Sequence, residues 1–415
     1  MSLLRRLTLL SSAVMLTASI YGAGSVEPDI QSLQDWINSK RMITVKELGG
    51  QLSISGDVHT EMQTGSRRSA VPSPFSDGKF HTFYDVEFNL SVDYRTDNSW
   101  LAARLRFDND AGIFNPLLGS GKKDKFKIDR AYFGYRLVDK DQHTMDVEIG
   151  RRGALTSLFD SRIQFASHFD GVSVKDSYSI ENVGDVYYQV GAFMVNEMRE
   201  HAALVGEAGF LNIANTGLYT KYSLIDWDTK SLDWSVNGAI SKSPVFNFAV
   251  SQMIVGYKCY PLLWKKPTMF YVAGLYNHKA RPVSVGTFEL TNGKKANVGG
   301  YAGFSLGSMK KAGDWAFDAN YQVLEAQCIP DFDVSGIGFN YLPQEGFYTN
   351  GITPVTSKNG VHGNVNYKGI ELCLQYLLTS NLNVFQAWRQ SVTLDRTITP
   401  FQTYRVYEID LIYSF

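Results

Sequence analysis

Two carboxylates two residues apart, Asp85 and Glu87, have the side chains that a general acid and a general base would need. They lie in the stretch YDVEFNLSVDYR, in which apolar and polar residues alternate from Tyr84 to Arg95. In a β-strand, residues i and i+2 point to the same face whatever the protein does. The spacing of this pair is therefore that of a strand with one polar face, and it does not by itself indicate an active site.

Other signals for catalysis and metal binding are weak. His59, His81 and His143 do not have the HExxH spacing of a zinc site, and GSGKK from Gly119 lacks the four-residue gap and the Ser or Thr of a phosphate-binding loop. The three cysteines are scattered and form no CxxC pair, which indicates structural thiols rather than a disulfide framework or a metal site. We predict a protein that is not an enzyme and that has no cofactor and no metal site.

The overall charge excludes one class of partner. The 415 residues carry a net charge of −1, and the isoelectric point is near 6.7. A nucleic-acid partner would require a concentrated basic surface, so none is expected. The length fits two or three ordinary domains or one large all-β structure.

The elements that carry these residues are strands, because a period of two holds from Gly50 to the end of the chain. Sixteen alternating segments are expected to be strands, and they start near Gln51, Tyr84, Trp100, Lys127, His143, Asp170, Asp185, Thr216, Leu232, Val250, Thr268, Val298, Asp314, Asn366, Leu382 and Thr403.

Short and long connections alternate between these segments. The short ones read TDNS, DKDQ, IDWDTK and TSN, and the long ones cover 63–82, 110–126, 196–215, 277–297 and 327–366. This sorting places long and short connections at opposite ends of the sheet, as in outer-membrane barrels and unlike a β-sandwich. A sheet in lipid must also close, because it cannot leave an unpaired edge. We therefore predict an all-β fold over 50–415, a closed antiparallel transmembrane β-barrel of about sixteen strands.

The N-terminal residues differ from the rest of the chain. Residues 1–24 combine Arg5 and Arg6 with an apolar run and small residues, which is typical of a secretory signal peptide. Residues 25–49 have apolar residues at helical spacing and predict a short periplasmic amphipathic helix, between about Pro28 and Met42. Two roles remain open for it: contact with a neighbouring molecule, or a cap on the barrel.

In a membrane barrel the apolar face points outward and the polar face lines the lumen. The last, first and second strands are then expected to line the lumen with the acidic residues Asp57, Glu61, Asp85, Glu87, Asp93, Glu408 and Asp410. The third and fourth strands and the end of the fifth are expected to add the basic residues Arg104, Arg106, Arg130, Arg136, Arg151 and Arg152. An acidic wall beside a basic one creates a transverse field that selects ions. The alternative is that these residues neutralise one another in pairs.

The chain ends in VYEIDLIYSF, which alternates through to its last residue. Apolar side chains occupy every second position: Tyr407, Ile409, Leu411, Tyr413 and Phe415. A terminal aromatic residue preceded by such alternation resembles the signal that the barrel assembly machinery of outer membranes recognises. The last strand is expected to pair with the first and close the barrel.

The stretch MDVEIGRRGALTSLFDSRIQFASHFDGVSVKDS resembles the sixteen-stranded general porins of Gram-negative bacteria. Gly150 and Arg151 match the end of a strand, residues 152–168 match a third loop, and residues 171–174 match the returning strand. The resemblance implies a loop that folds into the barrel and narrows it, although the family's Pro-Glu-Phe-Gly-Gly-Asp loop tip is absent. EIGRR, FDGV and PDFDVSGIG are also similar to putative porins of chlamydia-like bacteria.

These features predict an outer-membrane porin for passive diffusion of small polar solutes and ions. Its expected partners are outer-membrane lipid, the barrel assembly machinery and the solutes themselves, and association into a homotrimer is left open. A different function is an adhesin or structural barrel that acts through its long outer loops, such as the loop 327–366.

Overall fold

The computed structural model describes most of the chain from Ile43 to the C-terminus. The described residues are 43–47, 50–69, 78–79, 82–108, 125–152, 159–165, 168–196, 201–228, 233–236, 239–242, 247–263, 266–282, 284–285, 288–289, 293–330, 333–338, 365–398 and 401–415. The predicted signal peptide and the predicted helix at 28–42 lie outside these residues. No helix in the described ranges is long and apolar enough to cross a membrane.

One large antiparallel sheet of eighteen strands forms the molecule. Two of these strands, β1 (Ile43–Glu47) and β3 (Gly78–Lys79), pair only with β2 and lie outside the closed ring. The other sixteen form the barrel: β2 (Gly50–Ser69), β4 (Phe83–Arg95), β5 (Ser99–Asp108), β6 (Lys125–Lys140), β7 (His143–Arg152), β8 (Phe169–Ile180), β9 (Gly184–Asn196), β10 (His201–Ile213), β11 (Leu218–Asp228), β14 (Phe248–Leu263), β15 (Lys266–Asn277), β18 (Val298–Gly307), β19 (Trp315–Leu324), β20 (Tyr367–Leu377), β21 (Leu382–Thr393) and β22 (Gln402–Ser414). Two separate hairpins and one 3-10 turn complete the described elements: β12 (Asp233–Val236) with β13 (Ala239–Lys242), β16 (Ser284–Val285) with β17 (Phe288–Glu289), and η3 (Gly336–Gly338).

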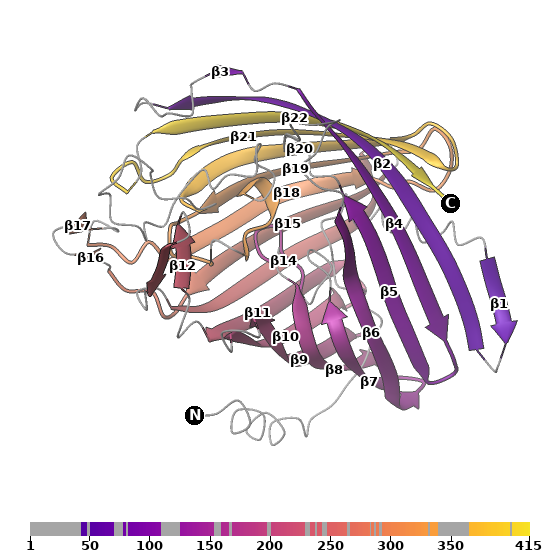
Figure 1. Ribbon diagram of the computed structural model, residues 1–415. Coiled ribbons are helices and arrows are strands. Elements are labelled where there is room, and N and C mark those ends of the chain that lie inside the picture. Colours follow the sequence, from indigo (N-terminus) through magenta and orange to yellow (C-terminus); the bar gives the residue numbers. More distant parts are fainter. Residues whose placement is uncertain are drawn as a thin grey trace.

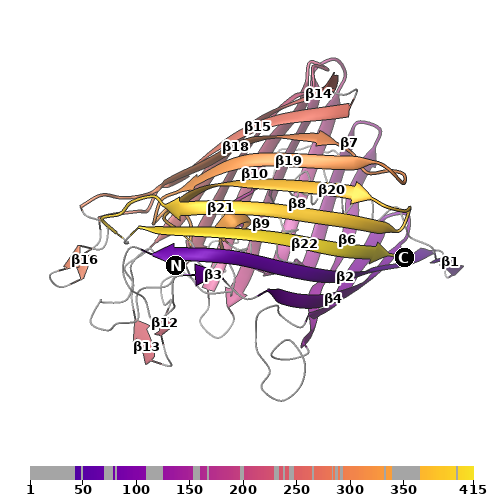
Figure 2. The same ribbon diagram turned by 90° about the horizontal axis from the view of Figure 1, so that it is seen from above.

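Each barrel strand pairs with its neighbours in chain order, and β22 returns to pair with β2 from Asp57↔Ser414 to Ser69↔Gln402. Figures 1 and 2 show β22 lying beside β2, with β1 and the C-terminus at one end of the barrel and the small hairpins at the other. The predicted closed antiparallel barrel of sixteen strands is confirmed.

Two errors in the predicted strand list cancel in the total. The segment from Leu232 is not a barrel strand, because its described part is the separate β12–β13 hairpin. The predicted connection 196–215 instead contains β10, and IDWDTK includes the end of β11. β10 lacks polar and apolar alternation because its inward residues Ala203 and Val205 pack in an apolar cluster inside the barrel. Alternation identified the hairpin as a strand but could not show that it lies outside the ring.

Successive residues of the barrel strands alternate between two environments. On β4, Tyr84 and Val86 are 56% and 41% exposed, whereas Asp85 is 9% exposed and Asn89 is fully buried. The exposed face is apolar and the buried face polar, which is the reverse of a soluble β-protein. Lipid accepts an apolar outer face, and closure satisfies the backbone of every strand. The outward and inward faces are those predicted from the sequence.

An apolar cluster fills part of the barrel interior. Phe159, Ile163 and Phe165, from the segment after β7, pack with Val334 and Ile337 and with inward-facing residues of strands from β8 to β20. Barrels of sixteen strands are wider than their wall side chains can fill. Here two inward-folded segments, 159–165 and 333–338, occupy part of that space.

Cysteine labelling tests the assignment of the two faces. After the native cysteines are replaced with Ser, we expect Asp85→Cys and Glu87→Cys in lipid vesicles to react with a charged, water-soluble thiol reagent. Val86→Cys and Phe88→Cys should react at least about 10-fold more slowly, because lipid excludes the charged reagent from the outer face. The reverse order of reactivity would contradict the assignment.

Candidate functional site

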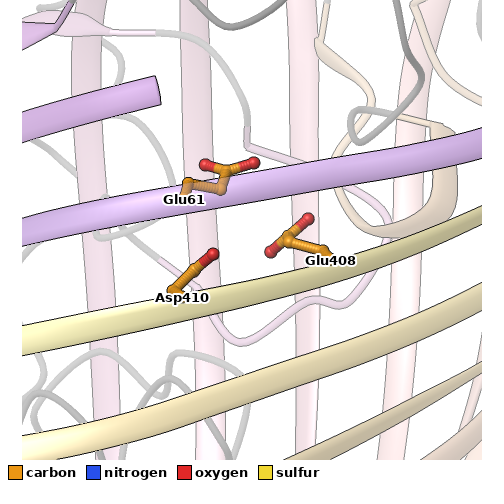
Figure 3. A group of neighbouring side chains, drawn as sticks. All are labelled: Glu61, Glu408 and Asp410. Atoms are coloured by element: carbon orange, nitrogen blue, oxygen red, sulfur yellow. The ribbon is translucent and has the colours of Figure 1, made fainter. Parts of the chain in front are cut away.

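The acidic residues predicted to line the lumen lie on the buried, polar face of three adjacent strands. This acidic strip consists of Asp57 and Glu61 on β2, Asp85, Glu87 and Asp93 on β4, and Glu408 and Asp410 on β22. Strand pairing brings its members together, because Glu61 lies opposite Asp410 on one side and opposite Asp85 on the other. The carboxylates of Glu61, Glu408 and Asp410 lie together, with one oxygen of each within 4.8 Å of those of the other two (Figure 3).

The basic residues Arg104 and Arg106 lie on the inner face of β5, next to the acidic strip. On β6 a β-bulge shifts the register between Arg104↔Arg130 and Leu105↔Ile128. The bulge inserts Asp129, which is 5% exposed, and brings it to the inner face beside Arg130. Arg130 forms no ion pair with another described residue, and its Nε atom is buried without a partner.

The inner face of the next strand pair carries two further predicted arginines. Arg136 of β6 donates to Asp146 of β7 from Nε at 2.8 Å. Arg152 contacts Glu148 and lies over the Tyr132 ring, with its Cζ atom 4.6 Å from the ring centroid. Both cations are therefore engaged by the wall itself.

Arg151 differs from the prediction. It lies on the same face as Ile149, which is 43% exposed, and its Nε atom donates to Asp170 at 2.7 Å. Consecutive residues of a strand point to opposite faces, so only one of Arg151 and Arg152 can face the lumen. The structure places Arg152 inside and Arg151 outside.

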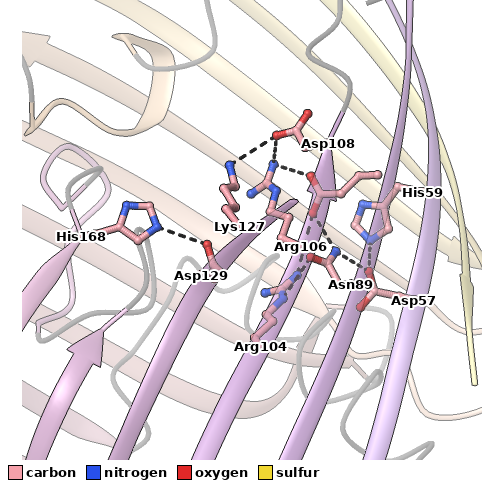
Figure 4. A network of polar contacts seen from close by, with 10 residues as sticks. Asp57, His59, Asn89, Arg104, Arg106, Asp108, Lys127, Asp129 and His168 are labelled. Carbon is pink, nitrogen blue, oxygen red and sulfur yellow. Dashed lines mark hydrogen bonds and ion pairs between the residues drawn. The ribbon is translucent and has the colours of Figure 1, made fainter. Parts of the chain in front are cut away.

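The acidic and basic residues meet in a network of ion pairs rather than as two separate walls (Figure 4). Arg106 contacts Glu87 and pairs with Asp108 at 3.1 Å, and Arg104 lies 3.9 Å from Glu87. Lys127 reaches Asp108 at 3.5 Å. The pairwise neutralisation that the sequence left open is thus present for several of these residues.

Polar side chains connect this network to both neighbouring strands. Asn89 donates to Asp57 at 2.7 Å and accepts from Arg104 at 3.1 Å, and His59 lies 2.6 Å from Asp57. His168 lies 3.3 Å from Asp129. The hydrogen bonds hold the ends of the arginine and carboxylate side chains in fixed positions along the wall.

Six residues of the network were not predicted from the sequence. His59, Asn89 and Asp108 have the same strand parity as the predicted lumen residues Asp57, Glu87 and Arg106, so alternation alone could have found them. Lys127 has the opposite parity to Arg130 and faces inward only because of the β-bulge. Asp129 is hidden by the β-bulge, and His168 comes from the loop after β7. No pattern in the sequence signals these last two contacts.

The segment 159–165 crosses the interior and is anchored to the opposite wall. Asp160 pairs with Lys221 of β11 at 3.1 Å, and Ser161 donates to Gln252 of β14 at 2.8 Å. A second loop supports it, because Ser335 donates from its backbone nitrogen to the Ile163 carbonyl at 2.7 Å. The segment therefore lies inside the barrel, held between the wall and the loop that contains η3.

The deepest anchor is the pair of Arg162 and Asp318, 2.7 Å apart, with side chains 3% and 1% exposed. The Tyr271 hydroxyl donates to Asp318 at 3.0 Å, and the Arg162 guanidinium lies 4.2 Å from the centroid of the Tyr271 ring. The ion pair is shielded from water and has further hydrogen bonds, which are the conditions under which a buried pair is retained.

Exposure differs between the charged side chains of the interior. The side chains of Arg106 and Lys127 are 30% and 38% exposed, whereas those of Arg162 and Arg389 are 3% and 6% exposed. The two more accessible cations belong to β5 and β6, whereas Arg162 faces the segment 159–165 and Arg389 is held between wall carboxylates. The arrangement leaves a charged surface along which hydrated ions and polar solutes can move.

A Gly-x-Ser-x-Gly sequence occurs at 303–307, centred on Ser305. In serine hydrolases this motif activates its serine on a strand-to-helix turn. Here Ser305 lies within β18, and its hydroxyl donates to Asp318 on β19. The motif therefore serves as a contact within the wall and gives no support to an enzyme.

No protein-family model and no curated protein matches the chain by sequence. The high-pH structure of OprB from Pseudomonas putida matches with a TM-score of 0.52 and 13% identity, over 96% of this chain and 100% of that chain. The chain has a porin-like fold.

Two further structures match less well: OmpT of Vibrio cholerae with loop L8 deleted, and a triple mutant of the Rhodopseudomonas blastica porin. Each has a TM-score of 0.43 and covers 88% of this chain and 100% of its own, at 11% and 10% identity respectively. At such identities the likeness concerns the fold alone.

Proposed function

We propose that this protein is an outer-membrane porin through which small polar solutes and ions diffuse passively. One observation carries the proposal: the closed barrel has an apolar outer face, and part of its inner face keeps charged side chains accessible to water. An enzyme would need a reacting group and an activating neighbour, whereas a pore needs only an accessible polar path. The path follows β4, β5 and β6.

The segment 152–168 acts as the constriction of this pore. Support comes from its described residues 159–165, which are tied to β11, β14 and β19 inside the barrel. These anchors hold the segment against one wall and direct solutes to the charged wall opposite. The constriction thus decides which charges a solute meets.

The alternative of an adhesin acting through its long loops has less support. The described part of the loop 327–366 includes Asp333, Ser335 and Gly336, which are buried against the segment 159–165. A loop folded inward is suited to capping the barrel rather than to binding another cell. The rest of that loop lies outside the described residues.

Location and assembly follow from the same proposal. The chain is exported by the signal peptide at 1–24, inserted into the bacterial outer membrane by the barrel assembly machinery and surrounded by lipid. Of the residues offered for recognition, Tyr407, Ile409, Leu411 and Tyr413 lie on the outer face of β22, and Phe415 follows the end of this strand. Association of three copies would bury part of this outer face.

Planar-bilayer recording tests the proposed function. The purified full chain, refolded in detergent and added to one side of the bilayer, should produce stepwise conductance that grows with salt concentration. A folded barrel that gives no steps over a wide range of salt would contradict the porin proposal.

We expect charge at the accessible wall to set ion selectivity. Arg104→Ser with Arg106→Ser should shift the reversal potential in a salt gradient toward cation preference, and Asp85→Asn with Glu87→Gln should shift it the opposite way. One charge 4 Å from an ion is worth about 1 kcal/mol in water, which corresponds to roughly a 5-fold change in the permeability ratio.

Salt provides the control for this prediction. Screening shortens from about 10 Å at 0.1 M to about 3 Å at 1 M, so the shifts should shrink at high salt. Arg130→Ser should act more strongly than Arg106→Ser, because Arg130 has no carboxylate partner among the described residues. Unchanged reversal potentials at low salt in all of these variants would show that selectivity is set elsewhere.

A further inference from the structure

The barrel closes at a cluster of three carboxylates, Glu61 of β2 with Glu408 and Asp410 of β22. Figure 3 shows the three side chains grouped on the neighbouring strands, and one oxygen of each carboxylate lies within 4.8 Å of those of the other two. Asp85 adds a fourth carboxylate on the other side of Glu61, in direct register with it. Negative charge is therefore concentrated at the seam between the first and last strands of the barrel.

Two of the three carboxylates have no partner to balance them. Asp410 is 7% exposed, and its Oδ1 atom is buried with no hydrogen-bond partner. Oε1 of Glu61 and the amide oxygen of Gln63 are buried in the same way. No described residue donates to Asp410 or Glu61. Buried polar atoms are almost always paired, and an exception of this kind indicates a missing ion or ligand.

The nearby cations do not balance the cluster. Arg389 donates to Glu408 from Nη1 at 2.6 Å, but its Nε atom donates to Glu371 at the same distance. One guanidinium thus faces four carboxylates when Glu61 and Asp410 are included. Arg106 is engaged by Glu87 and Asp108. The cluster of Glu61, Glu408 and Asp410 therefore keeps an excess of negative charge.

We propose that Glu61, Glu408 and Asp410 bind a divalent cation of the Ca²⁺ type that joins the first and last strands. Hard divalent cations take oxygen ligands, and Ca²⁺ accepts six to eight of them in irregular arrangements. Three carboxylates provide up to six oxygens, and the Gln63 amide oxygen and water can complete the shell. The ligand set contains no nitrogen or sulfur, which disfavours zinc and copper.

Such an ion has two effects beyond passive diffusion. It links β2 to β22, the first and last strands of the barrel, and so it stabilises closure of the ring. It also neutralises part of the acidic strip, so that cation preference falls when the site is filled. No metal site was predicted from the sequence, because Glu61 is separated from Glu408 and Asp410 by more than three hundred residues and meets them only when the barrel closes.

Calorimetric titration of Ca²⁺ into the full chain tests the site. The refolded protein in detergent, freed of divalent ions with a chelator, should bind one Ca²⁺. Asp410→Asn and Glu61→Gln should each weaken binding on the order of 10-fold or more, because each removes a charged ligand at nearly constant volume. Asp146→Asn is the matched control. It removes an inward-facing carboxylate of β7 that accepts a hydrogen bond from Arg136 of β6, and it should leave Ca²⁺ binding unchanged.

Thermal unfolding gives an independent measurement. Ca²⁺ should raise the unfolding temperature of the unmodified protein and of Asp146→Asn, but not that of Asp410→Asn, because a ligand stabilises only the state that binds it. Glu61→Gln provides a second variant if Asp410→Asn fails to fold.

Two results would overturn the proposal. The first is that the unmodified protein does not bind Ca²⁺ at millimolar concentration. Protons shared between the carboxylates, rather than a metal ion, would then neutralise the cluster. The second is binding that persists unchanged in both folded variants. Neither result bears on conductance, so the porin proposal is judged separately.

Discussion

Deletion of Phe415 should remove most of the folded barrel from the membrane. The backbone nitrogen of Phe415 donates to the Gly56 carbonyl at 2.9 Å, and the Gly56 nitrogen donates back at 3.0 Å. Its ring stacks on Phe88 of β4, with the centroids 6.4 Å apart. Loss of two hydrogen bonds and an aromatic contact costs about 2–4 kcal/mol, which is a large part of the stability of an ordinary domain.

The measurement is the fraction of heat-modifiable, folded protein on a gel, taken both from cells and after refolding in detergent. If the assembly machinery reads Phe415, the deletion should lower the level in cells more than the yield of refolding. Phe415→Tyr, which keeps the ring and both backbone hydrogen bonds, should fold nearly normally. Normal membrane levels of the deleted chain would contradict the proposed role of the last residue.

Arg162→Met should widen the pore. The substitution leaves Asp318 buried without its cation, which costs about 3–5 kcal/mol for a pair this well shielded. The substitution should destabilise the position of the segment 159–165 rather than the barrel wall, because strand pairing holds the wall. We expect the segment to leave the wall and single-channel conductance to rise.

A double variant separates loss of the anchor from loss of the fold. Arg162→Met combined with Asp318→Asn removes the orphaned charge, so it should recover much of the lost stability and part of the original conductance. Asn keeps the acceptor that the Tyr271 hydroxyl uses. If Arg162→Met folds and conducts like the unmodified protein, the segment does not limit the pore.

Much of the wall could be predicted from the sequence, because strand parity is a local property. A residue two positions from Asp85 must share its face, and this placed Glu87 and the other acidic residues of the strip correctly relative to Tyr84 and Val86. The same rule failed where the chain departs from regular pairing. It could not detect the bulge at Asp129. Continued from Glu148 and Ile149, the same rule assigns Arg152 to the lumen and Arg151 to the outer face, as the structure has them.

The sequence by itself determined the period of two, the apolar and polar faces, the sorting of loops and the pairing of the last strand with the first. These follow from which neighbours along the chain share a face. Only the tertiary structure decided that β10 belongs to the ring while the hairpin at 233–242 does not. It alone brought Arg162 to Asp318 and Glu61 to Asp410. Such contacts depend on closure of the barrel and on the inward path of a loop, and both join residues that are far apart in the sequence and carry no local pattern.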